Sequence, residues 1–313
     1  MIKIKRSLSV FFIIISSIFI ILYISDKKNI SNVSVTNKNK ILIKDGNEYT
    51  KSYDYTFFKQ DDNYDVYEYD DLINIFYKVL NQGWEEFTFY CDNSYVNCIN
   101  DVSLISNDED LLSNISNYVH PYNSYSSVKT SYDDTGEVTI TVNYIYTEDE
   151  IEKINNEVER IINELEIDNL SSNREKIKTI HDYIVNNTKY DVNKADKLHS
   201  DYDSSRITGV LFEHYGVCSG YADTMALFLE NMGIKNFKVS SNTHVWNAVY
   251  LDNDWYHLDV TWDDPVSKNG TDSLTYNYFL ITNEELKEKQ ESYDEHIFNQ
   301  SFYLELKENN EIV

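Results

Sequence analysis

Three residues in the C-terminal half of the sequence have the side chains that thiol-based acyl transfer needs. Cys218 lies in the segment YGVCSGYA, His244 begins the segment HVWN, and Asp259 lies in the segment WYHLDVTWDDP. A cysteine attacks an acyl carbon, a histidine moves the thiol proton to the leaving amine, and a carboxylate fixes the histidine tautomer and stabilises the imidazolium. The sequence therefore predicts a Cys-His-Asp triad, with the main-chain amide of Cys218 as one oxyanion donor.

The residues after Cys218 predict a helix that begins at the thiol. Apolar residues recur there with helical spacing until Gly233, which supplies the stop. Cys218 lies four residues before Ala222, on the stripe that this helix buries, so its side chain is expected to point toward the next layer of structure. The amides and dipole of a helix N-terminus favour thiolate over thiol. Gly216 and Gly220 allow another backbone or a substrate to come close, and a buried structural cysteine is the alternative.

The histidine and the aspartate fall on a predicted hairpin. Residues 243–251 and 255–262 have strand character and are joined around 252–253. A loop of two residues makes His244 and Asp259 diagonal neighbours on one face, and a loop of four places them directly opposite each other. A loop of three would put them on opposite faces. The triad can therefore form if this turn has two or four residues, but not if it has three.

These three segments, in this order, resemble the transglutaminase-like core domain. The resemblance covers roughly residues 170–285, less than half of the chain. It implies a papain-like α+β fold, with the cysteine on a helix start and the histidine and aspartate on adjacent strands of an antiparallel sheet. It also implies acyl transfer from amides, as a protease, amidase or cross-linker, and we expect no cofactor. Members that cleave glycans from glycoproteins carry extra zinc-binding cysteine pairs, and the lack of any Cys-x-x-Cys here disfavours that branch.

Further residues near the motifs have two interpretations each. Tyr221, Trp246 and Trp262 are predicted to line the substrate site, with plain core packing as the alternative. His257 and His181 are interpreted as structural histidines, and an exposed position is also open for His181.

Several carboxylates around the hairpin raise the question of a Ca²⁺ site. Their spacing lacks the regular alternation and the closing glutamate of an EF-hand loop. We therefore predict no metal and interpret them as solvated turn carboxylates. They are Asp252, Asp254, Asp259, Asp263 and Asp264.

The N-terminus predicts a membrane anchor. Lys3, Lys5 and Arg6 precede an uncharged run at 7–24 that is rich in Ile and Phe. The run can just span a bilayer core of ~30 Å at ~1.5 Å per residue, and no Ala-x-Ala cleavage site follows it. We expect the basic tail inside a bacterial cell membrane and residues 26–313 outside it, with a cleaved signal and secretion as the alternative.

The three cysteines fit an extracellular compartment. Cys91 and Cys98 lie seven residues apart in CDNSYVNC, a segment rich in turn formers. They could close a small disulfide loop in an oxidising setting, and two unpaired thiols are the alternative. Cys218 is then the residue expected to be a free thiol.

The formal net charge of −26 limits the partners of the protein. A chain this acidic repels polyanions at neutral pH, so nucleic acid is excluded as an expected partner. The same repulsion keeps a secreted protein soluble. The expected partners are a protein or peptide substrate, including cell-wall peptides, and the membrane through the N-terminal helix.

Apolar periodicity and composition divide the chain into segments. No catalytic constellation is visible in the first folded segment, for which packing, spacing or ligand docking is the default role. We predict a signal anchor at 1–25, a polar stalk at 26–48, a small α+β domain at 49–146, a linking helix at 147–167 and the catalytic domain at 168–313.

The expected elements give an α+β fold. The helix from Thr147 has a capping box with Glu150, and the polar segment 190–205 could form a lip over a cleft. Helices are expected at 70–80, 108–118, 147–166 and 173–187, and strands at 53–58, 86–90, 127–132, 137–146 and 236–240.

The leading hypothesis is an extracellular, membrane-anchored cysteine hydrolase that acts on protein or cell-wall peptide amides through a thioester. A transamidase that joins Gln to Lys side chains is an alternative, because it shares the thioester and differs in whether water or an amine resolves it. A binding module that keeps the fold without catalysis is the alternative from another class, and the intact triad argues against it.

Overall fold

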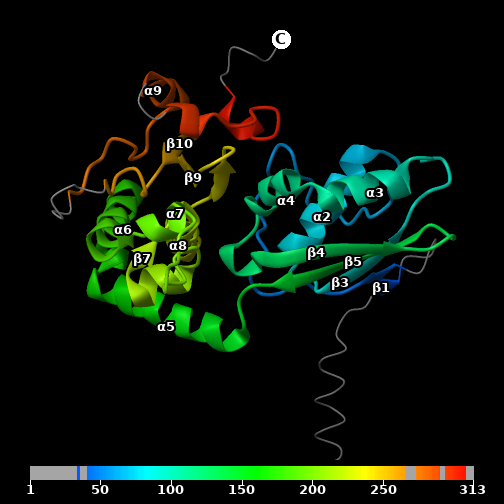
Figure 1. Cartoon of the computed structure of the whole chain (residues 1–313), viewed down its shortest axis with the longest axis horizontal. Coiled ribbons are helices and arrows are strands. Elements are labelled where there is room, and N and C mark those ends of the chain that lie inside the picture. Colours follow the sequence, from blue (N-terminus) through cyan, green and yellow to red (C-terminus); the bar gives the residue numbers. More distant parts are fainter. Residues whose placement is uncertain (1–33, 36–40, 266–272, 290–292, 308–313) are drawn as a thin grey trace, which may run out of the picture. The chain divides into compact units, whose positions relative to one another are not determined.

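The computed structural model describes residues 34–35, 41–265, 273–289 and 293–307 (Figure 1). The chain divides into two compact units, residues 1–45 and 46–313. The first contains two short antiparallel strands, β1 (Ser34–Val35) and β2 (Leu42–Ile43). The predicted anchor at 1–25 and most of the stalk lie outside the described residues. Among the residues that are described, no helix is long and apolar enough to cross a membrane.

The part of the second unit before residue 147 contains a three-stranded antiparallel sheet with strand order β3-β5-β4. Asp133 and Gly136 form the turn between β4 and β5 as predicted, since the Asp133 carboxylate accepts main-chain N–H groups and Gly136 has φ of 82°. Helices α2, α3 and α4 pack beside this sheet (Figure 1). The elements are α2 (Tyr69–Asn81), β3 (Glu86–Tyr90), α3 (Cys98–Asn107), α4 (Glu109–Ser116), β4 (Tyr125–Tyr132) and β5 (Glu137–Tyr144).

Two features of this part differ from the sequence prediction. The strand predicted at 53–58 is wrong, because this stretch is irregular and ends in bends. Its aromatic residues anchor the chain to the core instead of forming one face of a sheet; Phe58 is buried and stacks on Tyr77 with ring centroids 4.0 Å apart. Helix α3 is absent from the predicted elements, because its Asn and Ser residues favour turns as strongly as a helix.

Cys91 and Cys98 form a disulfide, with their Cα atoms 5.8 Å apart. Cys91 directly follows β3, and Cys98 is the first residue of α3. Of the two alternatives, the structure therefore has the paired one, and Cys218 is a free thiol.

The later part of the second unit places one long helix against an antiparallel sheet of order β10-β9-β8. Helix α8 packs against β8, β9 and α6. Thr147 and Glu150 form the predicted capping box at the start of α5. The elements are α5 (Glu148–Glu164), α6 (Asn173–Asn187), α8 (Cys218–Asn231), β8 (Asn236–Ser240), β9 (Val245–Leu251) and β10 (Asp254–Leu258).

Short elements complete the second unit. The polar segment after α6 is more ordered than predicted, since β6 pairs in parallel with β7 directly before α8. The short elements are β6 (Lys189–Tyr190), α7 (Val192–Ala195), η3 (Gly209–Glu213), β7 (Tyr215–Gly216), α9 (Asn283–Glu288), η4 (Tyr293–His296), η5 (Leu304–Leu306), and the single turns η1 (Pro121–Asn123) and η2 (Ile167–Asn169).

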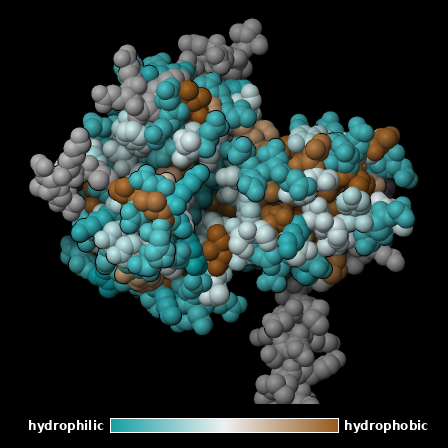
Figure 2. All heavy atoms as spheres, viewed as in Figure 1, coloured by the Kyte–Doolittle hydropathy of each residue, from teal (hydrophilic) through white to brown (hydrophobic). Residues whose placement is uncertain are grey.

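The two parts of the second unit are joined by buried contacts at the edge of β8. Lys51 forms an ion pair with Glu230 at 2.7 Å and donates to the Asn236 carbonyl at 2.9 Å. Tyr118 stacks on Phe237 with centroids 4.7 Å apart. The small α+β segment thus supports the sheet that contains the hairpin of β9 and β10. Hydrophilic residues cover most of the face shown in Figure 2, as expected for this acidic chain.

Candidate active site

The loop before α8 builds the helix start at Cys218. Val217 is the N-cap residue in extended conformation, its side chain provides no cap, and its N–H donates to the Ser204 carbonyl at 2.9 Å. A Cβ at Gly220 would collide with that carbonyl oxygen, so the glycine allows the loop to approach the first helical turn. Cys218 is half-buried at this position. The predicted helix start at the thiol is therefore confirmed, and the close approach at Gly220 is made by the chain itself.

The turn between β9 and β10 has one of the two lengths that place His244 and Asp259 on the same face of the hairpin. Leu251 pairs with Asp254, which leaves a loop of two residues. Both loop residues, at 252–253, have positive φ, 54° and 69°, the conformation of a type I′ turn. His244 directly precedes β9 and Asp259 directly follows β10, so the two side chains meet at the open end of the hairpin.

His244 and Asp259 form a buried pair. Nε2 of His244 lies 2.5 Å from Oδ2 of Asp259, and the two residues are 7% and 1% exposed. The other carboxylate oxygen accepts the main-chain N–H groups of Thr261 and Trp262 at 3.0 and 3.1 Å. Burial alone would raise the pKa of Asp259, but the charge and hydrogen bond of His244 hold that pKa well below its usual range. Asp259 is therefore a carboxylate.

The same contacts make His244 a stronger base than a free imidazole. Burial acts to lower its pKa, but the charge and hydrogen bond of Asp259, with a further contribution from the Cys218 side chain, raise the pKa of His244 to about 10. Because Nε2 faces Asp259, Nδ1 is the ring nitrogen left for the thiol. The structure thus pairs His244 with Asp259 and places Cys218 close enough to contribute to the pKa of the imidazole; the catalytic roles of the three residues stay a prediction.

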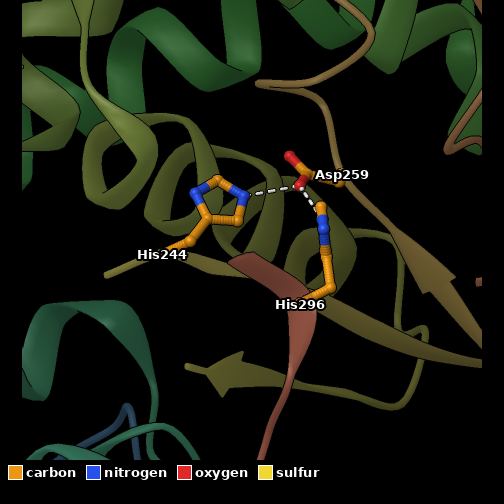
Figure 3. A group of neighbouring side chains, drawn as sticks. All are labelled: His244, Asp259 and His296. Atoms are coloured by element: carbon orange, nitrogen blue, oxygen red, sulfur yellow. Dashed lines mark hydrogen bonds and ion pairs between the residues drawn. The ribbon is translucent and has the colours of Figure 1, made fainter. Parts of the chain in front are cut away.

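A second histidine, absent from the predicted site, contacts the same carboxylate. His296 lies in η4, and its Nε2 is 2.9 Å from Oδ2 of Asp259 (Figure 3). Figure 3 shows the two imidazoles approaching Asp259 from different elements. No motif marks His296, which follows Asp259 by 37 positions in a polar stretch. Sequence reasoning had no signal for it.

Tyr190 is a further residue beside the thiol that the prediction missed. Tyr190 pairs with Gly216, two residues before Cys218, through the β6–β7 ladder. Burial, followed by the charges of Cys218 and Glu295, raises the pKa of Tyr190 to about 12. The phenol therefore stays neutral beside the site at physiological pH.

Two of the predicted lining residues are buried and pack or form hydrogen bonds inside the fold next to the site. Tyr221 is fully buried and donates its hydroxyl to Asp264 at 2.5 Å. Trp246 is also buried; its ring lies nearly parallel to that of His244, with centroids 5.7 Å apart, and its Nε1 donates to His257 at 2.9 Å. Burial lowers the pKa of His257 to about 3. His257 is therefore a neutral acceptor that orients Trp246, as expected of a structural histidine.

Trp262 is the predicted lining residue that keeps exposed surface. It is half-buried and lies edge-on to His244, with centroids 6.4 Å apart. Its main-chain N–H holds Asp259 at the same time. Substrate contact by Tyr221, Trp246 and Trp262 stays a prediction, and only Trp262 has the exposed surface that such contact needs.

The interpretation of the hairpin carboxylates as solvated is correct for Asp252 and Asp254, which are exposed. It is wrong for Asp259, Asp263 and Asp264, which are buried because each finds hydrogen-bond partners inside the fold. Asp264 accepts a hydrogen bond from the Tyr221 hydroxyl. Asp263 accepts from a buried main-chain N–H and a half-buried threonine hydroxyl, and it also contacts a buried histidine.

One set of side chains could hold a metal ion among the residues that the structure describes. Ligand atoms of His244, Asp259 and His296 all lie within 4.8 Å of one another, and two imidazoles with a carboxylate suit Zn²⁺. Both Nε2 atoms already contact Oδ2 of Asp259 in hydrogen-bond geometry. The hydrogen-bonded arrangement therefore accounts for the cluster without a metal.

Comparison with known proteins identifies the class of this domain. Residues 162–260, which include all three predicted triad residues, match the family model of the transglutaminase-like superfamily. This segment is a transglutaminase-like domain, and mixed α+β structure surrounds it. His296 lies beyond the matched segment.

Individual relatives are distant. Mouse kyphoscoliosis peptidase is 26% identical over 136 residues, which cover 37% of this chain and 20% of that protein; the chain thus spans about a fifth of that relative's length. A solved structure described as a TGase is 17% identical, covers 47% of this chain and 48% of its own, and has a TM-score of 0.34. A candidate cysteine protease of Cytophaga hutchinsonii is 14% identical, with coverages of 43% and 61% and a TM-score of 0.27.

Proposed function

We propose that this protein is a membrane-anchored cysteine hydrolase that cleaves protein or cell-wall peptide amides outside the cell. The observation that carries the proposal is the buried His244–Asp259 pair, with the free thiol of Cys218 at the start of α8 near enough to help raise the pKa of the imidazole. The match to a transglutaminase-like domain supports a cysteine enzyme. A base oriented by a buried carboxylate is the usual means of activating a nucleophile.

The first half of the proposed reaction makes a thioester. The Cys218 thiolate attacks the amide carbon, a C–S bond forms, and the carbonyl oxygen becomes an oxyanion that the main-chain amide of Cys218 can stabilise. His244 then donates its proton to the amide nitrogen. The C–N bond breaks, the amine leaves, and the acyl group remains on sulfur.

The second half releases the acid. His244 takes a proton from water as the oxygen attacks the thioester carbon. The C–S bond breaks, a carboxylic acid leaves, and the thiol is restored. Asp259 stays ionised throughout and stabilises the imidazolium that forms in each half.

The location of the reaction is part of the proposal. Lys3, Lys5 and Arg6 followed by the apolar run at 7–24 support an anchor with the catalytic domain outside. The Cys91–Cys98 disulfide supports an oxidising compartment. Fractionation of the producing cells tests this location, since a protein found only in the cytosol would contradict it.

Thiol alkylation tests the activated nucleophile without knowledge of the substrate. We expect iodoacetamide at neutral pH to label Cys218 of the wild type at least about tenfold faster than Cys218 of a His244→Ala variant. Cys218→Ser is the control for labelling at other sites. Equal rates in wild type and His244→Ala would favour a non-catalytic binding module.

An amine probe separates hydrolysis from transamidation. A Gln-containing donor protein is incubated with the enzyme and a fluorescent primary amine. Hydrolysed donor without incorporated amine supports the hydrolase, because water alone has resolved the thioester. Incorporation of the amine would identify a transamidase.

A further inference from the structure

We infer that His296 is a positioning residue of this site, which acts through Asp259 to hold His244 toward Cys218. The inference rests on the proposed function. It goes beyond the triad because His296 lies outside the segment that matches the transglutaminase-like model, which ends at residue 260.

The first argument is the geometry at the carboxylate. His296 Nε2 lies 2.9 Å from Oδ2 of Asp259, the same oxygen that His244 Nε2 contacts at 2.5 Å (Figure 3). The main-chain N–H groups of Thr261 and Trp262 bind Oδ1. Asp259 therefore has two partners on each oxygen, and it cannot rotate about its side-chain bonds without breaking several hydrogen bonds.

The second argument is the surroundings of His296. The residue is 1% exposed. Its ring stacks on Tyr278 with centroids 5.2 Å apart and planes 9° apart, and it lies against Trp246 and Trp262 at 4.8 and 5.7 Å. An apolar side chain would fill an aromatic enclosure of this kind without desolvating polar nitrogens. The hydrogen bond to Asp259 offsets that cost.

The third argument is how the segment is held. Phe298, two residues after His296, forms an antiparallel bridge with Ser241. Ser241 in turn donates its main-chain N–H to the His244 carbonyl at 2.9 Å. The segment that contains His296 is thus hydrogen-bonded to the turn that contains His244, and this attachment holds both imidazoles next to Asp259.

The consequence for catalysis follows from these contacts. Without His296, one partner of Oδ2 is lost, and the carboxylate can turn away from His244 for part of the time. The imidazole then loses its orientation toward the thiol, which slows both halves of acyl transfer while leaving the surface that substrate contacts intact. Substrate affinity should change little.

Two variants separate the hydrogen bond from the packing. His296→Leu removes the donor and keeps an apolar side chain of similar size, whereas His296→Gln keeps an N–H group close to the position of Nε2. The measurement is turnover of p-nitrophenyl acetate by the full chain, with kcat and KM determined separately. This small activated ester acylates the thiol directly and does not depend on the natural substrate.

We expect His296→Leu to lower kcat about 10- to 100-fold with KM within about twofold of wild type, and His296→Gln to recover most of the loss. Equal loss in both variants would overturn the inference, because the ring would then matter for packing alone. An unchanged kcat in His296→Leu would overturn it as well. If His296→Leu does not fold, His296→Asn replaces it, since its amide is too short to reach Oδ2.

The outcome is distinguishable from failure of the proposed function. If wild-type Cys218 reacts with iodoacetamide no faster than Cys218 of His244→Ala, the proposed function fails. If wild type is activated and His296→Leu turns over the ester as fast as wild type, only the role of His296 fails.

Discussion

Two of the buried histidine–aspartate pairs in the described part of the chain, each built on a different aspartate, lie in adjacent positions. His244 and Asp259 lie 2.5 Å apart, and His181 and Asp263 lie 3.1 Å apart. All four residues are buried. The pairs adjoin along the chain, because the main-chain N–H of Asp263 donates to the Asp259 carbonyl.

The two pairs differ in what surrounds the imidazole. Both ring nitrogens of His181 contact carboxylates, Nε2 that of Asp263 and Nδ1 that of Asp182 at 3.0 Å. Asp263 also accepts the main-chain N–H of Tyr278 at 3.0 Å. His244 instead uses Nε2 for Asp259, and the Cys218 side chain contributes to its raised pKa, so we assign Nδ1 to the thiol. A buried pair therefore serves structure when both nitrogens are held, and it can serve catalysis when one is left for a nucleophile.

The largest expected effect distinguishes the two aspartates by activity. We expect Asp259→Asn to lower kcat for p-nitrophenyl acetate about 10³- to 10⁴-fold, because an amide cannot stabilise the imidazolium. Asp263→Asn should lower it less than about tenfold, since His181 takes no part in proton transfer. Steady-state kinetics on both purified variants measure this. Similar losses in the two would mean that the pairs act as one network.

A second prediction distinguishes the pairs by stability. Asp263→Ala removes the partner of His181, Tyr278 and a hydroxyl in the core, so we expect the free energy of unfolding to fall by about 3–5 kcal/mol. Equilibrium unfolding in guanidinium chloride measures it. Lys178→Ala, which removes an ion pair of a half-exposed lysine with Asp182, is the control and should cost at most about 1 kcal/mol. An Asp263→Ala variant as stable as this control would refute the structural role.

The smallest expected effect is in the pH dependence of stability. The pKa of His244 is raised to about 10, so its contribution is complete below the unfolded-state pKa of ~6.5 and is lost as pH rises toward 10. The depressed pKa of Asp259 gives the opposite pH dependence. The carboxylate contributes to stability above pH ~4, and this contribution is lost as the pH falls further.

The alkaline part of this dependence can be assigned to His244 by a variant. Between pH 6.5 and 10 we expect wild type to lose at least about 1–2 kcal/mol more unfolding free energy than His244→Gln, since each unit by which the folded-state pKa exceeds the unfolded-state pKa is worth about 1.4 kcal/mol. Denaturant titrations of both proteins across this range provide the comparison. Parallel curves would contradict a charged His244 in the folded protein.

Local patterns predicted the elements that carry the triad. Helix α8 begins at Cys218 and ends before Gly233, because apolar spacing and a glycine with φ of 66° act within one or two turns. The two-residue turn at 252–253 is one of the loops that bring His244 and Asp259 onto one face. The strand predicted at 53–58 is wrong because the alternation of its aromatic residues reflects long-range packing instead of a local pattern.

The sequence by itself determined the chemical types in the site, the helix start at the thiol and the hairpin, because capping, periodicity and turn formation depend on neighbouring residues. Only the tertiary structure decided which further histidines meet the buried carboxylates beyond the predicted His244–Asp259 pair. His296 reaches Asp259, and His181 reaches Asp263, across 37 and 82 positions. No local pattern encodes such pairings, since they arise when buried polar groups must find partners as the layers pack together.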